Sequence, residues 1–397
     1  MQKKLLAVAV ASALGAPLAA QAQDSPGSST VQVFGTVYVE YTVRAKQGNS
    51  VVAGNPELSK ADFLQTPGSE IGFKGEERLG GGLSAWYQCT TTADPRGQSQ
   101  NGWCSRNSAL GLKGGFGNVF IGNWDTPFKR TISPNTVGGN DTGIWGTAFV
   151  LTGDSTTDAV GANRANFKKR QQNSLNYDSP NFGGFQVMGM FTSSQPSTAT
   201  LNSGTNSKPR VWSIGAQYSA GPLYVSGAYE QHREFTGAAG PNNVKDHGWH
   251  LGAAYTFGPV RFGGLYTRQQ FDTPALPTGS EVKVSAWHLG VDWTIVGPHG
   301  LRAAYSQAGN MKGTAGVLVG AASGAGYRPA PTPGFDTGAK LYQIRYVFTM
   351  SKRTEFNAGF VKLHNDNAAA YNLGGLGAAH VAGASQNAWA VSMRHTF

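Results

Sequence analysis

The sequence predicts an all-β fold: a transmembrane antiparallel β-barrel of sixteen strands, with short turns at one rim and long loops at the other. Three observations support this prediction. Apolar and polar residues alternate over segments of about ten residues, as in strands with two different faces. Tight Gly/Pro turns alternate strictly with long polar connections. Beyond the N-terminal leader, no window offers the about 20 apolar residues that a transmembrane helix needs.

The leader is typical of an exported protein. Lys3 and Lys4 precede the apolar run Leu5–Ala20, and Ala20-Gln21-Ala22 fits a small-residue cleavage site. We therefore expect residues 1–22 to be a secretory signal peptide and residues 23–397 to form the barrel domain. Loss of the two lysines lowers the net charge from +10 to +8.

Composition excludes two other classes. Hydrophobic residues make up 40% and aromatic residues 11% of the 397 residues, which is too apolar for a disordered chain. The 55 glycines lack the three-residue period of collagen.

Turns and strands can be counted along the chain. Residues 31–44 form the first predicted strand, with Val37 and Val39 on one face and Glu40 and Arg44 on the other. Seven tight turns each join two further strands, which gives fourteen, and residues 386–397 form the sixteenth and last strand. The turns lie at 80–82, 114–117, 180–184, 220–222, 258–259, 296–300 and 349–353. The longer connections lie near 45–69, 90–104, 125–169, 193–209, 231–246, 269–281, 308–338 and 365–385.

Aromatic residues gather near the short-turn ends of the strands. Such a ring is typical of a membrane interface; it comprises Tyr177, Phe185, Tyr218, Tyr255, Phe257, Trp293, Tyr346, Phe348, Phe356 and Phe397. An alternative explanation is that these aromatic residues form the core of a soluble β-sandwich, but such a fold rarely needs sixteen strands. The last strand ends at Phe397, and we expect it to close the barrel against residues 31–44.

The two cysteines predict a disulfide. Cys89 and Cys104 are 15 positions apart with turn signals between them, and an exported protein folds in an oxidising compartment. The alternative is two free thiols.

Several runs resemble the Gram-negative general porins of the β-proteobacterial type. These runs are SEIGFKG (69–75), LGGGL (79–83), SRNSALGLKGGFG (105–117), NSLNYDSPNFGGF (173–185) and the terminal MRHTF (393–397). The resemblance covers residues 31–397.

The resemblance implies an assembly and a pore. It implies a homotrimer in the outer membrane, in contact with lipid and lipopolysaccharide, with periplasmic turns and extracellular loops. The third loop, here Asp125 to about Lys169, would fold into the lumen and narrow it. The second loop would reach over the neighbouring subunit. The family often has Arg where this chain has Glu70, so part of a basic cluster is missing.

Strand parity selects candidate residues at the pore constriction. Counting from lipid-facing residues places Glu40, Arg44, Glu70, Lys74 and Arg170 in the lumen. Lys168 and Lys169 complete the densest basic run, which a solvated loop end would also explain. Arg261, Arg302, Arg345 and Arg394 also count as inward, nearer the periplasmic mouth. Arg106 has the same parity as Leu110 and Leu112, so a regular strand would turn its charged side chain toward lipid. Because that is costly at mid-depth, we expect a bulge or a rim position there.

The third loop would set carboxylates opposite this basic wall: Asp125, Asp141, Asp154 and Asp158. Opposed charges make a transverse field that orients polar solutes. The sequence therefore predicts passive diffusion of small hydrophilic solutes and ions, with a mild preference for anions.

Two other functions stay open at this stage. One is a channel dedicated to an organic anion or a sugar; the other, from a different class, is an outer-membrane enzyme or adhesin. No catalytic motif with usable spacing occurs, and no basic, aromatic-interleaved patch indicates a nucleic-acid partner. His247 and His250 would point to opposite faces of a strand, so neither a metal nor a cofactor is predicted.

Overall fold

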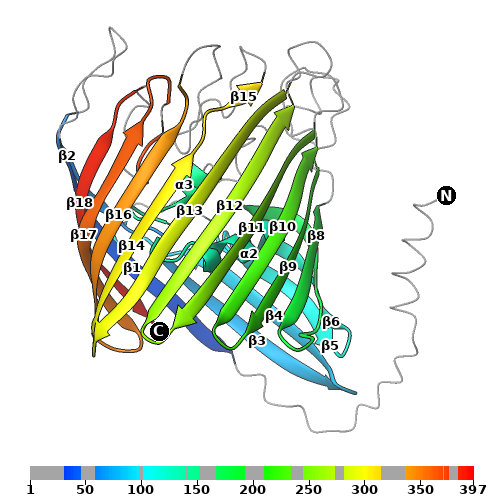
Figure 1. Ribbon diagram of the computed structural model, residues 1–397. Coiled ribbons are helices and arrows are strands. Elements are labelled where there is room, and N and C mark those ends of the chain that lie inside the picture. The colour runs from blue at the N-terminus through cyan, green and yellow to red at the C-terminus, as the bar shows by residue number, and fades with distance from the viewer. Residues whose placement is uncertain are drawn as a thin grey trace.

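The computed structural model describes residues 31–45, 59–97, 102–139, 142–152, 167–192, 210–233, 245–272, 281–313, 336–369, 371–374 and 383–397. The predicted signal peptide, residues 1–22, lies outside these ranges. The described strands form one antiparallel sheet that closes on itself as a barrel (Figure 1).

The elements follow one another along the chain with few helices among them. They are β1 (Gln32–Arg44), β2 (Ala61–Gln65), β3 (Glu70–Gly80), β4 (Leu83–Thr92), β5 (Ser108–Gly114), β6 (Gly117–Asp125), α2 (Pro127–Ile132), the 3₁₀ helix η1 (Ser133–Asn135), α3 (Ala148–Leu151), β7 (Arg170–Asp178), β8 (Phe185–Thr192), β9 (Arg210–Ala220), β10 (Leu223–Arg233), β11 (Lys245–Phe257), β12 (Val260–Asp272), β13 (Glu281–Val296), β14 (His299–Ala308), β15 (Lys312–Gly313), β16 (Ala339–Thr349), β17 (Thr354–Asn365) and β18 (Gln386–Thr396).

These eighteen strands occupy sixteen positions in the barrel wall. Strands β2 and β3 share one position, because β2 pairs with residues 40–44 of β1 and β3 pairs with residues 32–36. Strands β14 and β15 share another, because both pair with β13 at successive heights. The sixteen-stranded barrel is confirmed. The short strands β2 and β15 lie in connections where the sequence predicted none.

Pairing between the first and last strands closes the barrel. Strand β1 pairs with β18 from Thr36 opposite Thr396 to Arg44 opposite Ala388. Beyond β18, Phe397 exchanges two backbone hydrogen bonds of 3.1 Å with Gly35. The predicted closure at Phe397 is confirmed, and it leaves neither terminal strand as a free edge.

The two rims of the barrel differ as predicted. All seven tight turns lie at one end, here called the turn rim, and the strand ends joined by longer connections lie at the other, the loop rim (Figure 1). Eight of the ten predicted interface aromatics are exposed on the outer face above the turn rim: Tyr177, Phe185, Tyr218, Tyr255, Phe257, Trp293, Tyr346 and Phe397. Phe348 and Phe356 there are half-buried.

Strand parity is broken by a bulge in β7, and the pairing register also shifts near the turn rim, at Arg78–Gly80 of β3 and Thr294–Val296 of β13. Leu175 and Tyr177 are exposed on the outer face while Ser174 and Asn176 are buried inside. At Asn173 the φ angle is +51°, and the pairing with β6 shifts there. Above the bulge, Gln171 is therefore buried and Gln172 is exposed, whereas unbroken alternation from Leu175 and Tyr177 would turn Gln172 into the lumen.

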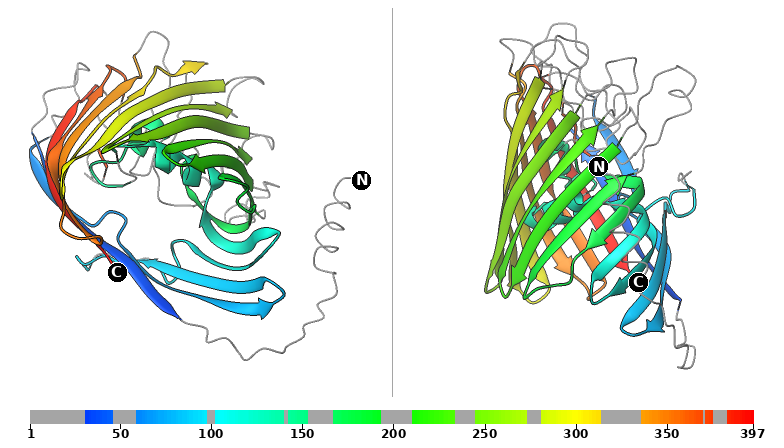
Figure 2. Two further views of the ribbon diagram at one scale, coloured as in Figure 1. Left: turned by 60° about the horizontal axis from the view of Figure 1, so that its bottom comes forward. Right: turned by 90° about the vertical axis from the view of Figure 1, so that its right-hand side faces the viewer.

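The third long connection folds back into the barrel. Figure 2 shows α2 and α3 inside the ring of strands, and residue contacts place α2 against β9, β10 and β11 and α3 against β13, β14 and β16. Thr126 caps α2, accepting a hydrogen bond from the amide of Lys129, and Pro127 begins it. Among the described residues, no helix combines the length and the apolar character that are needed to cross a bilayer.

Candidate functional site

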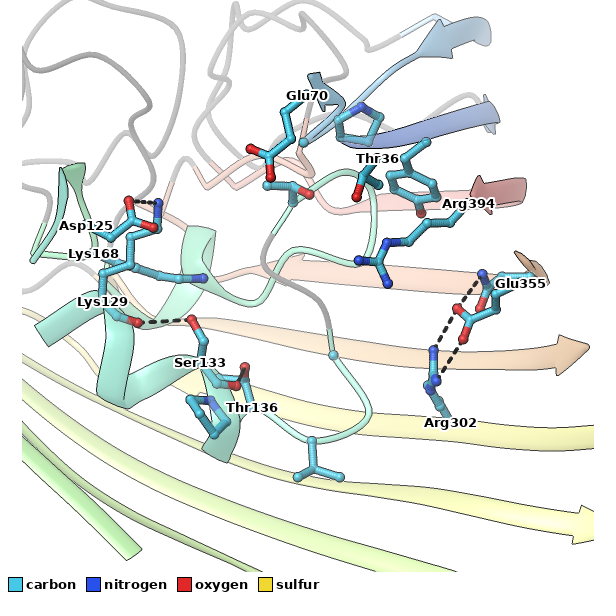
Figure 3. Close-up of a pocket in the computed structure, with 18 of the residues that line it drawn as sticks. Thr36, Glu70, Asp125, Lys129, Ser133, Thr136, Lys168, Arg302, Glu355 and Arg394 are labelled. Carbon is cyan, nitrogen blue, oxygen red and sulfur yellow. Dashed lines mark hydrogen bonds and ion pairs between the residues drawn. The ribbon is translucent and has the colours of Figure 1, made fainter. Parts of the chain in front are cut away.

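A cavity of about 790 Å³ occupies the lumen between the third loop and the barrel wall (Figure 3). Its lining combines eight cationic side chains with four acidic ones. The cationic residues are Arg106, Lys129, Lys168, Arg170, Arg261, Arg302, Arg345 and Arg394, and the acidic ones are Glu70, Asp125, Asp292 and Glu355. The lining therefore carries an excess of four positive charges among the described residues.

Toward the loop rim, cations pair with two of these carboxylates. Arg106 Nε donates to Glu70 at 2.5 Å. Asp125 accepts from Lys129 Nζ at 2.8 Å and lies 3.2 Å from Arg170 Nη2. Asn107 joins the two sides, since its amide nitrogen donates to Asp125 and its oxygen accepts from Arg170 Nε at 2.6 Å. The result is a polar chain across the tops of β3, β5, β6 and β7.

Toward the turn rim, neighbouring strands present charges at matching heights. Register places Arg261 opposite Asp292, Asp292 opposite Arg302, and Arg302 opposite Arg345. Arg302 donates to Asp292 at 2.9 Å and holds both oxygens of Glu355 at 2.9 and 3.0 Å. This bidentate pair is visible at the right of Figure 3.

All four carboxylates are therefore engaged by cations. Among the described residues, Arg261, Arg345 and Arg394 have no carboxylate within ion-pair distance. Arg394 is exposed, and Figure 3 shows its guanidinium directed into the cavity between Thr36 and the Arg302–Glu355 pair. The field along the described wall is positive because these charges are left over.

Wall side chains hold the backbone of the third loop from several strands. Arg261 donates to the carbonyl of Pro134 at 3.2 Å, His288 contacts the carbonyl of Val137 at 2.9 Å, and Arg345 donates to the carbonyl of Gly139 at 2.9 Å. A carbonyl only accepts, so His288 Nε2 carries the proton. Each contact satisfies a carbonyl that has no partner within a helix.

Glu40 holds the far side of the loop. Its Oε1 accepts from the amide of Ile144 at 2.8 Å, and its Oε2 accepts from the hydroxyl of Tyr38 at 2.8 Å. The carboxylate is fully buried beneath the loop. Glu40 is therefore an anchor for the loop in this structure and does not line the cavity.

Five predicted constriction residues line the cavity: Glu70, Arg106, Asp125, Lys168 and Arg170. Asp141, Asp154 and Asp158 lie outside the described residues. That the lining residues constrict solute flow stays a prediction.

Four other predicted constriction residues do not line the cavity. Besides Glu40, these are Arg44, which is buried against the carbonyl of Ser59 and the Phe63 ring, and Lys74, whose ammonium lies 5.0 Å from the centre of the Phe34 ring. Lys169 is buried as well. Strand parity correctly predicted that the strand residues point inward. An inward side chain can nevertheless be covered by the third loop, or lie at a different height in the barrel from the cavity.

Arg106 occupies the second of the two predicted arrangements, a position at the rim outside the regular strand. It precedes β5, its amide donates to the carbonyl of Thr90, and its side chain turns into the lumen toward Glu70. Regular alternation would have exposed this guanidinium to lipid, which is costly at mid-depth.

The predicted opposition of an acidic loop and a basic wall is not found in the described part of the loop. Asp125 is held by cations, and the loop itself presents Lys129 to the cavity. Sequence reasoning missed Lys129, because a short helix inside a loop carries no strand parity. Arg261, Arg302, Arg345 and Arg394, which the sequence placed inward and nearer the periplasmic mouth, line the same cavity.

The predicted disulfide joins Cys89 and Cys104. Cys89 lies opposite Phe73 in the register of β3 and β4, on the outer face of the barrel. Trp103, 77% exposed, stacks on Phe73 with ring centres 6.4 Å apart. The bond thus holds the second long connection against the outside of the wall.

Known proteins share this architecture. The anion-selective porin from Comamonas acidovorans matches with a TM-score of 0.71 and 22% identity, over 93% of this chain and all of that chain. OmpT of Vibrio cholerae, in its trimer form, matches with a TM-score of 0.62 and 14% identity over 93% of this chain and 99% of its own. At these identities the likeness concerns the fold.

Sequence relatives extend the comparison. The major outer membrane protein P.IB of Neisseria lactamica is 30% identical over 240 residues, which are 60% of this chain and 62% of the relative's length. The same protein of Neisseria meningitidis is 30% identical over 238 residues. The family model described as Gram-negative porin matches residues 7–368, nearly the whole barrel. By that match, the chain belongs to the family of Gram-negative porins.

Proposed function

We propose that the protein is a passive diffusion channel of the outer membrane for small hydrophilic solutes and ions, with a mild preference for anions. The observation that carries the proposal is the lumenal cavity with its excess of four positive charges. A polar lining favours hydrophilic solutes, because an apolar solute must displace water bound to the charged groups. No step of this transport requires energy coupling.

Family membership supports the location and the class of function. The relatives are named as outer membrane proteins, and the porin family indicates a channel rather than an enzyme. The Comamonas protein is described as anion-selective, which supports the same preference here. The surplus of Arg261, Arg345 and Arg394 supplies the electrostatic reason.

The proposal includes a homotrimer. The Vibrio protein of the same fold is described in a trimer form. The outer face around Trp103, Tyr41, Leu64 and Ile71 offers exposed apolar side chains that a second copy or lipid would cover. Contacts with outer-membrane lipid and lipopolysaccharide follow from the same location and stay predictions.

Liposome swelling tests the transport. Vesicles that contain the purified barrel should swell in solutes of equal size in the order anionic, neutral, cationic. Vesicles with a folded barrel that do not swell in any of these solutes would contradict the channel and favour an enzyme or adhesin. Swelling that saturates with a single solute would instead favour a channel dedicated to that organic anion or sugar.

Planar-bilayer recording tests the assembly. Protein extracted without heating should insert as steps in groups of three equal conductances. Single steps alone, with chemical cross-linking that yields only monomers, would contradict the trimer.

A further inference from the structure

The third loop lies on a belt of very small side chains. At one height of the inner wall, four neighbouring strands present Ala254, Gly263, Gly290 and Ala304. The four residues are paired in register across the strands. Gly263 lies opposite Gly290, Ala254 lies opposite Gly263, and Ala304 lies opposite Gly290. We refer to these four residues as the small-residue belt.

The loop backbone touches the belt at distances that exclude a side chain. A Cβ atom at Gly290 would lie 1.7 Å from the carbonyl oxygen of Val137. One at Gly263 would lie 2.4 Å from Val137 Cγ2 and 2.8 Å from the carbonyl oxygen of Asn135. Ordinary contacts between such atoms are roughly 3.5 Å, so even one methyl group must move the loop.

The same stretch of loop forms one side of the cavity. Pro134, Thr136, Val137, Gly138 and Gly139 all line the cavity. A loop lifted from the belt therefore has to move into the cavity, because the barrel wall is behind it and the cavity in front.

We propose that the small-residue belt, and Gly290 above all, sets the width of the pore. The belt lets the third loop lie directly on the wall, so the lumen keeps its open cross-section. His288 and Arg345, which hold the carbonyls of Val137 and Gly139, then fix the loop at that depth. This inference rests on the proposed channel function.

Three single-methyl variants test the belt. Gly290→Ala meets backbone at the closest distance, and Gly263→Ala meets mainly the movable side chain of Val137. The matched control is Gly189→Ala in β8, which faces outward with no atom within 4 Å of the added methyl. Each folded barrel is first verified by its heat-modifiable electrophoretic mobility.

We expect unit conductance to fall in the order Gly189→Ala, Gly263→Ala, Gly290→Ala. Gly189→Ala should equal the natural protein, and Gly290→Ala should lose roughly one third, because conduction depends on the open diameter. The largest sugar that permeates in liposome swelling should shrink in the same order.

Equal conductance in all three variants, or a rise in Gly290→Ala, would overturn the inference. If Gly290→Ala does not fold, the comparison of Gly263→Ala with Gly189→Ala still decides it. Absence of conductance in the natural protein would refute the channel instead. The belt would then be judged by whether Val137 is displaced in a crystal structure of Gly290→Ala.

Discussion

The second and third long connections leave the same rim of the barrel, yet they are held by different means. The third folds into the lumen, where wall side chains from several strands bind its backbone and glycines admit it to van der Waals contact. The second is held on the outer face by the Cys89–Cys104 disulfide. Asp94 also accepts a hydrogen bond from Thr66, and Arg96 donates one to the carbonyl of Leu64 in β2.

This difference reflects what each position requires. A loop inside the lumen must leave an open path, so its depth is fixed by complementary backbone surfaces. A loop outside obstructs nothing, and a few side-chain attachments are enough to order it. The comparison predicts that variants of the second connection change assembly and stability, whereas variants around the third change conduction.

The largest expected effect concerns the disulfide. Cys104→Ser should leave the barrel folded but lower the temperature at which trimers dissociate, measured by electrophoresis after graded heating. A bond that closes a 15-residue loop contributes about 3 kcal/mol by chain entropy. Reduction of the natural protein should have the same effect. Unchanged dissociation of both would show that this connection does not support assembly.

The anchor of the third loop should give the next effect. Glu40→Leu removes the two carboxylate oxygens that accept hydrogen bonds from the Ile144 amide and the Tyr38 hydroxyl. Loss of these bonds at buried donors should lower the free energy of unfolding by about 1–3 kcal/mol. We expect larger fluctuations of the open-channel current as the loop loosens. Glu40→Gln keeps one acceptor and should be intermediate. Noise equal to that of the natural protein in Glu40→Leu would contradict the anchoring role.

The surplus charge in the cavity is tested by two matched variants. Arg394→Gln should lower the ratio of anion to neutral-solute permeability by up to about fivefold, since a unit charge at 4 Å in water is worth about 1 kcal/mol. Lys74→Gln removes the same charge from an inward residue that does not line the cavity, and should change the ratio less. Equal shifts in the two variants would mean that position relative to the cavity is unimportant.

The smallest effect concerns the second connection. Arg96 donates to both oxygens of Asp94 and holds the pKa of that carboxyl well below its usual range. Asp94→Asn should therefore lower thermal stability by only about 0.5 kcal/mol at neutral pH. Because the pKa is depressed, the difference should persist to about pH 4, the ordinary pKa of Asp, and decline only below it. A difference that disappears between pH 7 and 5 would contradict this assignment.

The wall of the barrel was largely predictable from the sequence. Alternation and turn residues located all sixteen positions, because a strand between lipid and water imposes a period of two. The exceptions have local causes. Asn173 adopts a positive φ that shifts parity, and β2 and β15 are short strands in polar segments where alternation is too brief to detect.

The site was less predictable because it depends on register and on the loop. Gly263 and Gly290 are 27 positions apart in the chain, and only strand pairing makes them neighbours beneath Val137. Lys129 reaches the cavity from a six-residue helix whose position depends on the wall. Glu40 was correctly turned inward, but parity could not show that the loop covers it.

The most direct test of the central claim, that the barrel encloses an open pore with a positive lining, is the zero-current potential across a planar bilayer in a KCl gradient. The account predicts stable conductance with the concentrated side positive at zero current, as expected when chloride passes more readily than potassium. A concentrated side that is negative would contradict the assigned selectivity, and a folded barrel without conductance would contradict the pore itself.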